Sequence, residues 1–244
     1  MISQAFLTVL LSVGVYSASI RTGSSKCKHD DSDCIVEQLN EVFHSYYNGY
    51  PSLHLRQFEP LMIPKMNLKQ DGIINIDLAF KNVALSGLSK STIYKATGFK
   101  NNPDHNKLEI RLRTPALILD GPYKATGNVL FVPITAKGNS NLTLENIDVT
   151  LKFVTKKIER NGKVYMNIDK KKVSFESPKL LLKFTNKMGT KDFEDTMNNL
   201  LNASSNMVMK EVKPAICENF GAFYAEVINE VLSTIPYCDF FAPM

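Results

Sequence analysis

The chain has 244 residues, of which 44% are apolar and 22% are charged, and its formal net charge is +5. This composition is ordinary for a globular protein. After the N-terminal residues no segment is long and apolar enough to span a bilayer, which excludes further membrane-spanning helices.

The chain opens with an uncharged apolar run, Ala5–Val15, followed by small residues at 17–19. This pattern is typical of a secretory signal peptide. The run is shorter than the roughly 20 apolar residues that a spanning helix needs, although a retained anchor is the alternative. We therefore predict a signal peptide at 1–18, a single mature domain at 19–244, and a secreted, extracellular protein.

Two cysteines, Cys27 and Cys34, enclose the stretch KHDDSD. In an oxidising compartment, thiols pair into disulfides rather than binding metal ions. A zinc site would need a second pair of ligands at short spacing, and a calcium loop would need a glycine at its turn. Neither pattern occurs, so we predict a Cys27–Cys34 disulfide, no metal and no cofactor.

The other two cysteines lie far along the chain. If Cys217 lies in a helix that runs to about Ser233, it is about 24 Å from the end of that helix. The residues from there to Cys238 can retrace at most about 17 Å, whereas a disulfide needs Cα atoms within about 7 Å. We therefore predict that Cys217 and Cys238 are unpaired.

The next elements change from helical to extended. Apolar residues at helical spacing predict an amphipathic helix over 35–46, with Asp33 as a possible N-cap. From residue 72 onward apolar and polar residues alternate, which predicts antiparallel strands with one buried face. Asn161-Gly162, between the last two of these segments, is the strongest short hairpin signal.

From about Lys191 to Ser233 the apolar residues return to helical spacing. One helix of this length would measure about 65 Å, and Pro214 should kink it. Its apolar stripe must be buried against an equally long partner, and the preceding sheet is the only candidate. The predicted fold class is therefore α+β, with a long curved antiparallel sheet wrapped around a long C-terminal helix.

Methionine and aromatic residues on this helix provide a soft, adaptable apolar surface. They form either an ordinary core or the lining of an elongated space that a lipid-sized ligand could fill. These residues are Met197, Met207, Met209, Phe220, Phe223 and Tyr224.

Catalytic motifs are missing from the sequence, which has no G-x-S-x-G, H-E-x-x-H or P-loop pattern, so we predict no enzymatic activity. Residues 151–191 carry a net charge of +9. This basic segment is either an anion-attracting surface or a solvated strand face whose lysines protect an edge. No nucleic-acid partner is expected, because no recognisable binding module is present. The sequons at Asn141 and Asn202 are candidate glycosylation sites.

Four features in a fixed order resemble the insect takeout and juvenile-hormone-binding-protein family of secreted carriers, over nearly the whole mature chain. They are the Cys27 and Cys34 pair before an amphipathic helix, FEPLMIPKMNL leading into DGIINIDLAFKNVALSGLS, GPYKATGNVLFVPITAKGNSNLTLENI, and the tail VKPAICENFGAFYAEVINEVLSTIPYCDFF.

This resemblance implies a tubular, TULIP-like lipid-binding super-roll with a hydrophobic tunnel. It also implies that the Cys27–Cys34 clasp lies near the tunnel mouth, and that the protein carries juvenile hormone, fatty acids or other small lipids without catalysis. Hormone binders of the family have a second disulfide in the later half of the chain. The positions of Cys217 and Cys238 do not match that bridge, which favours a takeout-like member.

We therefore predict a secreted carrier of a small hydrophobic ligand, with no more than transient membrane contact. Tyr123 is the candidate for orienting a polar ligand group, or else a surface-turn aromatic, and the helix over 35–46 or its adjacent loops would move to admit the ligand. The alternative function is peripheral binding of anionic lipid surfaces through 151–191. The predicted lining residues are Ile35, Leu39, Tyr123, Val129, Phe131, Met207, Phe220, Phe223 and Val227.

Overall fold

The computed structural model describes residues 26–71, 74–129 and 132–243. The predicted signal peptide lies outside these residues and stays a prediction. The helices are α1 (Ser32–Ser45), α2 (Lys191–Ala203) and α3 (Ser205–Leu232), with short 3-10 turns η1 (Pro51–Leu53), η2 (Leu88–Lys90) and η3 (Tyr237–Phe240). The strands are β1 (Leu61–Gln70), β2 (Ile74–Ser86), β3 (Thr92–Thr97), β4 (Lys107–Val129), β5 (Val132–Arg160), β6 (Lys163–Glu176) and β7 (Lys179–Phe184).

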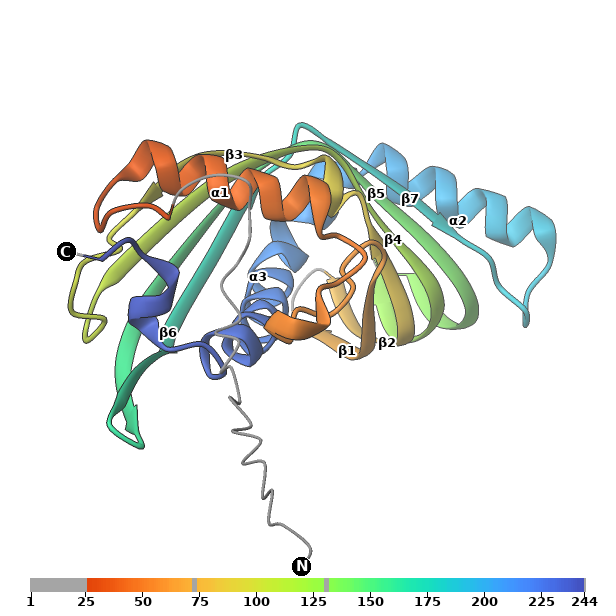
Figure 1. Cartoon of the computed structure of the whole chain (residues 1–244). Coiled ribbons are helices and arrows are strands. Elements are labelled where there is room, and N and C mark those ends of the chain that lie inside the picture. Colours follow the sequence, from red (N-terminus) through yellow and green to blue (C-terminus); the bar gives the residue numbers. More distant parts are fainter. Residues whose placement is uncertain (1–25, 72–73, 130–131, 244) are drawn as a thin grey trace, which may run out of the picture.

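All seven strands form one antiparallel sheet in the order β1-β2-β4-β5-β6, with β3 on β4 and β7 on β5. The two long strands, β4 and β5, pair along almost their full length, and each changes its outer partner part-way. The sheet curls around α3, with α1 near one end and α2 near the other (Figure 1). The predicted fold class is confirmed.

Two local features agree with the sequence pattern. Asn161 and Gly162 both have positive φ, 51° and 71°, as the tight turn between β5 and β6 requires. Gly127 has φ 136°, and a Cβ atom there would lie 2.1 Å from the carbonyl oxygen of Asn75. Only glycine lets β4 approach β2 this closely, which helps the sheet to curl.

Helices α1 and α3 cover open strand edges through asparagine side chains. Asn40 on α1 donates to the carbonyl of Ile93 at 2.9 Å and accepts from its N–H at 2.8 Å. Asn229 on α3 accepts from the N–H of Ile168 on β6 at 2.8 Å. These bonds satisfy backbone groups of the two edge strands that the sheet itself leaves unpaired.

Helix α2 covers the edge of β7 in the same way. The amide of Asn198 both donates to and accepts from the backbone of Phe184, each at 2.8 Å. One turn later, the amide of Asn202 accepts from the N–H of Leu182 at 2.9 Å and donates to its carbonyl at 2.7 Å. The i, i+4 spacing on α2 thus matches the i, i+2 spacing of same-facing residues on β7.

The prediction of one continuous helix over 191–233 is wrong. The helical stretch breaks at Ser204, which has φ −104° and ψ 15°, whereas α3 continues through the exposed Pro214. The bonds of Asn198 and Asn202 hold α2 against β7, while α3 packs mainly on β6 and β1. Because the two helices have different partners, they separate without a glycine or proline at the junction. Among the described residues, no helix is long and apolar enough to cross a membrane.

We predict that the sequon at Asn202 carries no glycan in the folded protein. A glycan would be attached to Asn202 Nδ2, which already donates to the carbonyls of Leu182 and Asn198. The Nδ2 of Asn141 donates only to the carboxylate of Asp120, in exposed surroundings. After expression in a secretory host, Asn141→Gln should remove any glycan mass and Asn202→Gln should leave it unchanged. Intact-mass spectrometry that finds a glycan on folded protein at Asn202 would contradict this prediction.

Candidate functional site

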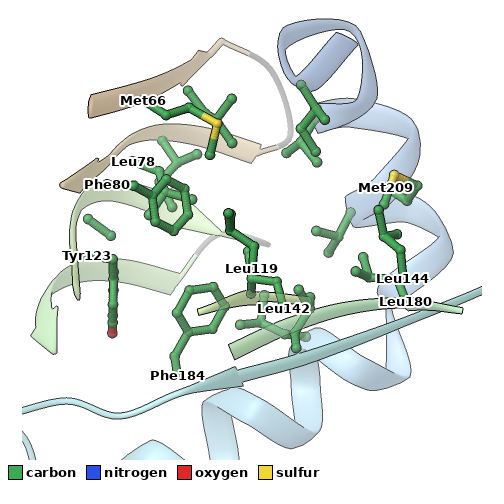
Figure 2. A pocket seen from close by; sticks show the side chains of 18 of the residues that line it. Met66, Leu78, Phe80, Leu119, Tyr123, Leu142, Leu144, Leu180, Phe184 and Met209 are labelled. Carbon is green, nitrogen blue, oxygen red and sulfur yellow. The ribbon is translucent and has the colours of Figure 1, made fainter. Parts of the chain in front are cut away.

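A long apolar cavity lies between the concave face of the sheet, α2 and α3 (Figure 2). Its empty space is about 1580 Å³, including the part that is open to solvent. The strands contribute Met66, Leu68, Ile76, Leu78, Phe80, Leu85, Leu117, Leu119, Tyr123, Ala125, Val129, Ile134, Ala136, Leu142, Leu144, Ile147, Val149, Val173, Phe175, Leu180, Leu182 and Phe184. The rest of the wall is Asn186, Phe193, Glu194, Met197, Asn198, Leu201, Val208, Met209, Val212, Ile216, Cys217, Phe220 and Tyr224.

The sheet side of the wall follows from strand alternation and register. Every second residue of a strand faces the same side, so paired residues form rows across the sheet. One row runs Leu119, Leu142 and Leu182, and its neighbour runs Leu117, Leu144 and Leu180. A third row pairs Ala125 with Ala136, and the short side chains of these two residues leave space between sheet and helix.

The helix side of the wall follows from a stripe with strict four-residue spacing on α3. Its members are Val208, Val212, Ile216, Phe220 and Tyr224. Residues four apart lie on one helix face, and the span from first to last is about 24 Å at 1.5 Å per residue. The cavity is therefore elongated along α3.

Most polar groups in the wall already have partners. The hydroxyl of Tyr123 donates to the carbonyl of Thr185 at 3.2 Å, and it points away from the cavity in Figure 2. The carboxylate of Glu194 accepts from the N–H of Asn186 at 2.8 Å. Burial is the main cause that raises the pKa of the Cys217 thiol. Among the described lining residues Glu194 is the only charged side chain, and none is Lys, Arg or His.

The wall reaches the protein surface beside α2. Phe193 lines the cavity, yet 42% of its surface is exposed. At the other end the wall stops at Tyr224, and beyond it Ala225 and Leu232 pack in a closed core with residues of α1 and β4. The exposed part of the described wall therefore lies beside α2.

The chain's similarity to known proteins extends over most of its length. A family model described as "Haemolymph juvenile hormone binding protein (JHBP)" matches residues 6–242. The chain belongs to the haemolymph juvenile hormone binding protein family. The resemblance that the sequence indicated is thus confirmed.

Similar proteins of comparable length share about a quarter of the aligned residues. "Circadian clock-controlled protein daywake" of Drosophila melanogaster is 25% identical over 223 residues, which cover 88% of this chain and 86% of that protein. Its counterpart in Drosophila yakuba is 23% identical over the same shares. The crystal structure of Epiphyas postvittana Takeout 1 matches with a TM-score of 0.76 at 22% identity, covering 88% of this chain and 98% of that one. At this identity the likeness shows a common fold.

In this member of the juvenile hormone binding protein family, the structure brings only some of the predicted lining residues to the cavity. Tyr123, Val129 and Phe220 lie in the wall. Phe131 lies outside the described residues. Ile35, Leu39, Met207, Phe223 and Val227 are not part of the wall. The strand residues Leu119, Leu142 and Leu182 were missed, because alternation alone does not say which strands meet across the tunnel.

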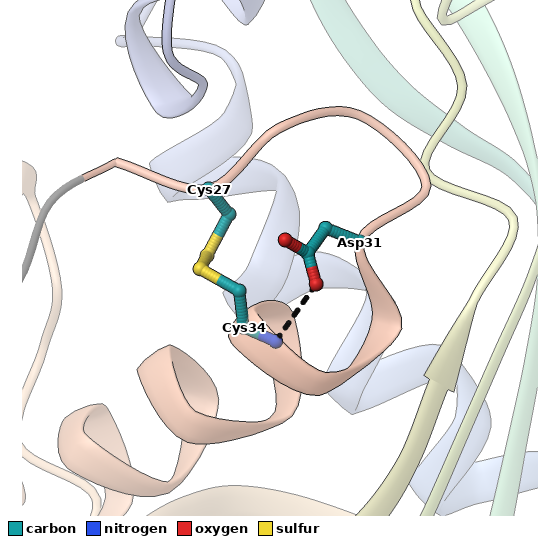
Figure 3. Close-up of a disulfide and its surroundings, with 3 residues drawn as sticks. All are labelled: Cys27, Asp31 and Cys34. Carbon is teal, nitrogen blue, oxygen red and sulfur yellow. Dashed lines mark hydrogen bonds between the residues drawn. A yellow bond between two sulfur atoms is a disulfide. The ribbon is translucent and has the colours of Figure 1, made fainter.

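Helix α1 supplies no residue to the described wall, although Val36, Leu39 and Phe43 pack against the core that includes much of it. Ile35 is buried against Cys27, Ala96 and Leu108 in the closed core, and Leu39 packs beside it. The predicted disulfide is confirmed, with Cys27 and Cys34 Cα atoms 5.6 Å apart (Figure 3). Cys217 and Cys238 are free, as predicted. The predicted N-cap Asp33 is wrong, because Asp31 accepts from the N–H of Cys34 at 3.2 Å and Asp33 lies in the first turn.

We expect exchange of a bound molecule to depend on α2. Asn198→Ala removes two hydrogen bonds that hold α2 on β7, so dissociation of a bound fluorescent apolar probe should accelerate about tenfold. Stopped-flow dilution measures this rate.

The matched control is the double variant Cys27→Ser and Cys34→Ser, which frees the start of α1 without touching the cavity wall. The rate at which the probe dissociates from this variant should stay within about twofold of the original rate. That change corresponds to only a few tenths of a kcal/mol in the activation barrier for dissociation. The reverse pattern, a fast disulfide variant and an unchanged Asn198→Ala, would place access at α1.

Proposed function

We propose that this protein is a secreted carrier that encloses a small hydrophobic ligand, such as a juvenile hormone-like terpenoid, a fatty acid or another lipid. The observation that carries the proposal is the continuous apolar wall, in which the four-residue stripe of α3 faces rows of leucines on β4, β5 and β7. Membership in the haemolymph juvenile hormone binding protein family supports the same function.

The energetics of such a cavity favour long ligands. Burying one methylene group contributes about 0.8 kcal/mol, whereas association itself costs roughly 4 to 15 kcal/mol. A ligand must therefore bury many carbons to bind tightly, and an elongated cavity along α3 provides that contact. The wall offers this contact without a set of polar groups arranged around a reactive centre, so carriage without catalysis is the proposal.

The alternative proposal is docking of residues 151–191 on an anionic lipid surface. Several lysines of this segment lie within 4 Å of a carboxylate, which lowers the positive charge available for docking. These pairs are Lys152 with Glu109, Lys157 with Glu159, Lys171 with Glu218, Lys179 with Glu145, and Lys191 with Asp195. The pairing favours a solvated strand face, and the carrier remains the first proposal.

A ring placed inside the cavity should block uptake. Val212→Phe projects from the middle of the α3 stripe into the space, so affinity for the fluorescent probe N-phenyl-1-naphthylamine should fall at least about tenfold, which is about 1.4 kcal/mol. The melting temperature should stay the same or rise, because the ring fills empty space. Fluorescence titration and thermal unfolding measure the two quantities.

The control is Ala222→Phe, which adds a ring to the exposed face of the same helix and should leave probe affinity unchanged. If Val212→Phe and the original protein bind the probe with equal affinity, the proposed carrier function is wrong. Co-sedimentation with anionic vesicles that is lost at high salt would support the alternative, since salt screens charge contacts at exposed surfaces.

A further inference from the structure

Tyr224 occupies the inner end of the cavity. It is the last member of the α3 stripe, about 24 Å from Val208 at 1.5 Å per residue. The next residue, Ala225, is already part of the closed core beneath α1. A chain that enters beside α2 and fills the cavity therefore reaches Tyr224 with its leading end.

The hydroxyl of Tyr224 differs from those of the two buried tyrosines, Tyr123 and Tyr237. Tyr123 donates to the carbonyl of Thr185, and Tyr237 donates to the carbonyl of Lys100 at 2.6 Å. Within the described part of the chain, Tyr224 has ring contacts with Phe220 and Phe223 but no hydrogen bond. The Tyr224 hydroxyl is therefore free to bond to a molecule that enters the cavity.

The surroundings of the Tyr224 hydroxyl keep it protonated, so that it can donate a hydrogen bond. The Tyr224 side chain is half-buried and lines the cavity. Burial alone raises the pKa of the Tyr224 phenol far above its ordinary value, so the group stays protonated at every physiological pH. A protonated phenol in an apolar space can donate one strong hydrogen bond to an oxygen that arrives there.

The charged groups of the wall determine which kind of ligand oxygen can bind at Tyr224. Among the described lining residues no Lys, Arg or His is present to balance an ionised ligand carboxylate at Tyr224. At the other end, the Glu194 side chain is 19% exposed, and its carboxylate lies 3.9 Å from Lys191 Nζ. Transfer of an unpaired carboxylate into an apolar site is very unfavourable. A neutral acceptor, such as a ketone, ester or ether oxygen, carries no such cost.

We propose that Tyr224 Oη donates a hydrogen bond to a neutral oxygen at the leading end of the ligand, so that the cavity selects neutral, oxygen-bearing lipids over hydrocarbons and over ionised fatty acids. This inference rests on the carrier function and narrows its ligand class. Tyr224 acts as a specificity-determining residue, while the apolar wall supplies most of the affinity.

The test compares three probes of equal chain length: 2-tridecanone, tridecane and tridecanoate. Each displaces N-phenyl-1-naphthylamine from the original protein and from Tyr224→Phe, which removes only the hydroxyl. In Tyr224→Phe, loss of one hydrogen bond should lower the affinity for 2-tridecanone about three- to tenfold. The affinity for tridecane should not change. The original protein should bind tridecanoate more weakly than 2-tridecanone at neutral pH.

Tyr123→Phe is the matched control, because it removes the hydroxyl of another wall tyrosine that is already bonded to Thr185. The ratio of ketone to hydrocarbon affinity should stay unchanged in this variant. Infrared spectroscopy of bound 2-tridecanone labelled with ¹³C at its carbonyl gives a second measurement. Its carbonyl stretch should lie at lower frequency in the original protein than in Tyr224→Phe. The melting temperature of Tyr224→Phe without ligand should stay close to that of the original protein, because the substitution removes no hydrogen bond between described residues.

The outcomes separate this inference from the carrier function. If both neutral probes displace the dye but Tyr224→Phe leaves their affinity ratio and the carbonyl stretch unchanged, the role of Tyr224 is overturned and the carrier stands. Tighter binding of tridecanoate than of 2-tridecanone would overturn the selection against ionised ligands. If the original protein binds neither dye nor any probe, the carrier function fails, and the role of Tyr224 fails with it.

Discussion

The need to satisfy the open edges of a rolled sheet organises this protein. An edge strand leaves one row of its N–H and C=O groups unpaired, and burying such groups is costly. Helices α1, α2 and α3 meet this need with the side-chain amides of Asn40, Asn198, Asn202 and Asn229, which bond to the backbone of β3, β7 and β6. An asparagine amide suits the task because it donates and accepts at once, as the peptide group of a neighbouring strand would.

These amide contacts also place the cavity. Because α2 is fixed to the edge of β7 and α3 packs on β6 and β1, the two helices separate at Ser204 and cover different parts of the concave face. The short side chains of Ala125 and Ala136 then leave space that α3 does not fill. At the opposite end, α1 and its Cys27–Cys34 disulfide belong to a closed core. The cavity is thus asymmetric, with its exposed wall beside α2 and its inner end at Tyr224.

The few polar groups of the wall give this space its chemical character. Among the described residues, the apolar wall has the free hydroxyl of Tyr224 at its inner end and the carboxylate of Glu194 near the surface. Such a cavity treats apolar molecules differently according to where their oxygen lies and whether it is ionised. The lysines of residues 151–191 lie outside this wall, and Lys152, Lys171 and Lys179 pair with carboxylates of other elements. The basic charge and the apolar cavity are therefore separate features of the molecule.

The sequence by itself determined the class of fold, the disulfide and the hairpin at Asn161-Gly162, because alternation, helical spacing and cysteine separation are local properties. The family was indicated separately, by the resemblance of four segments in a fixed order. It also indicated the soft apolar face of the C-terminal helices, including Tyr224. Only the tertiary structure decided that the helical stretch breaks at Ser204 and that Ile35 is buried outside the cavity wall. It also decided that Tyr123 has a hydrogen-bond partner, while Tyr224 has none within the described part of the chain. Each of these depends on which strands and helices meet across the roll, and contacts between residues so far apart in sequence leave no periodic pattern in the chain.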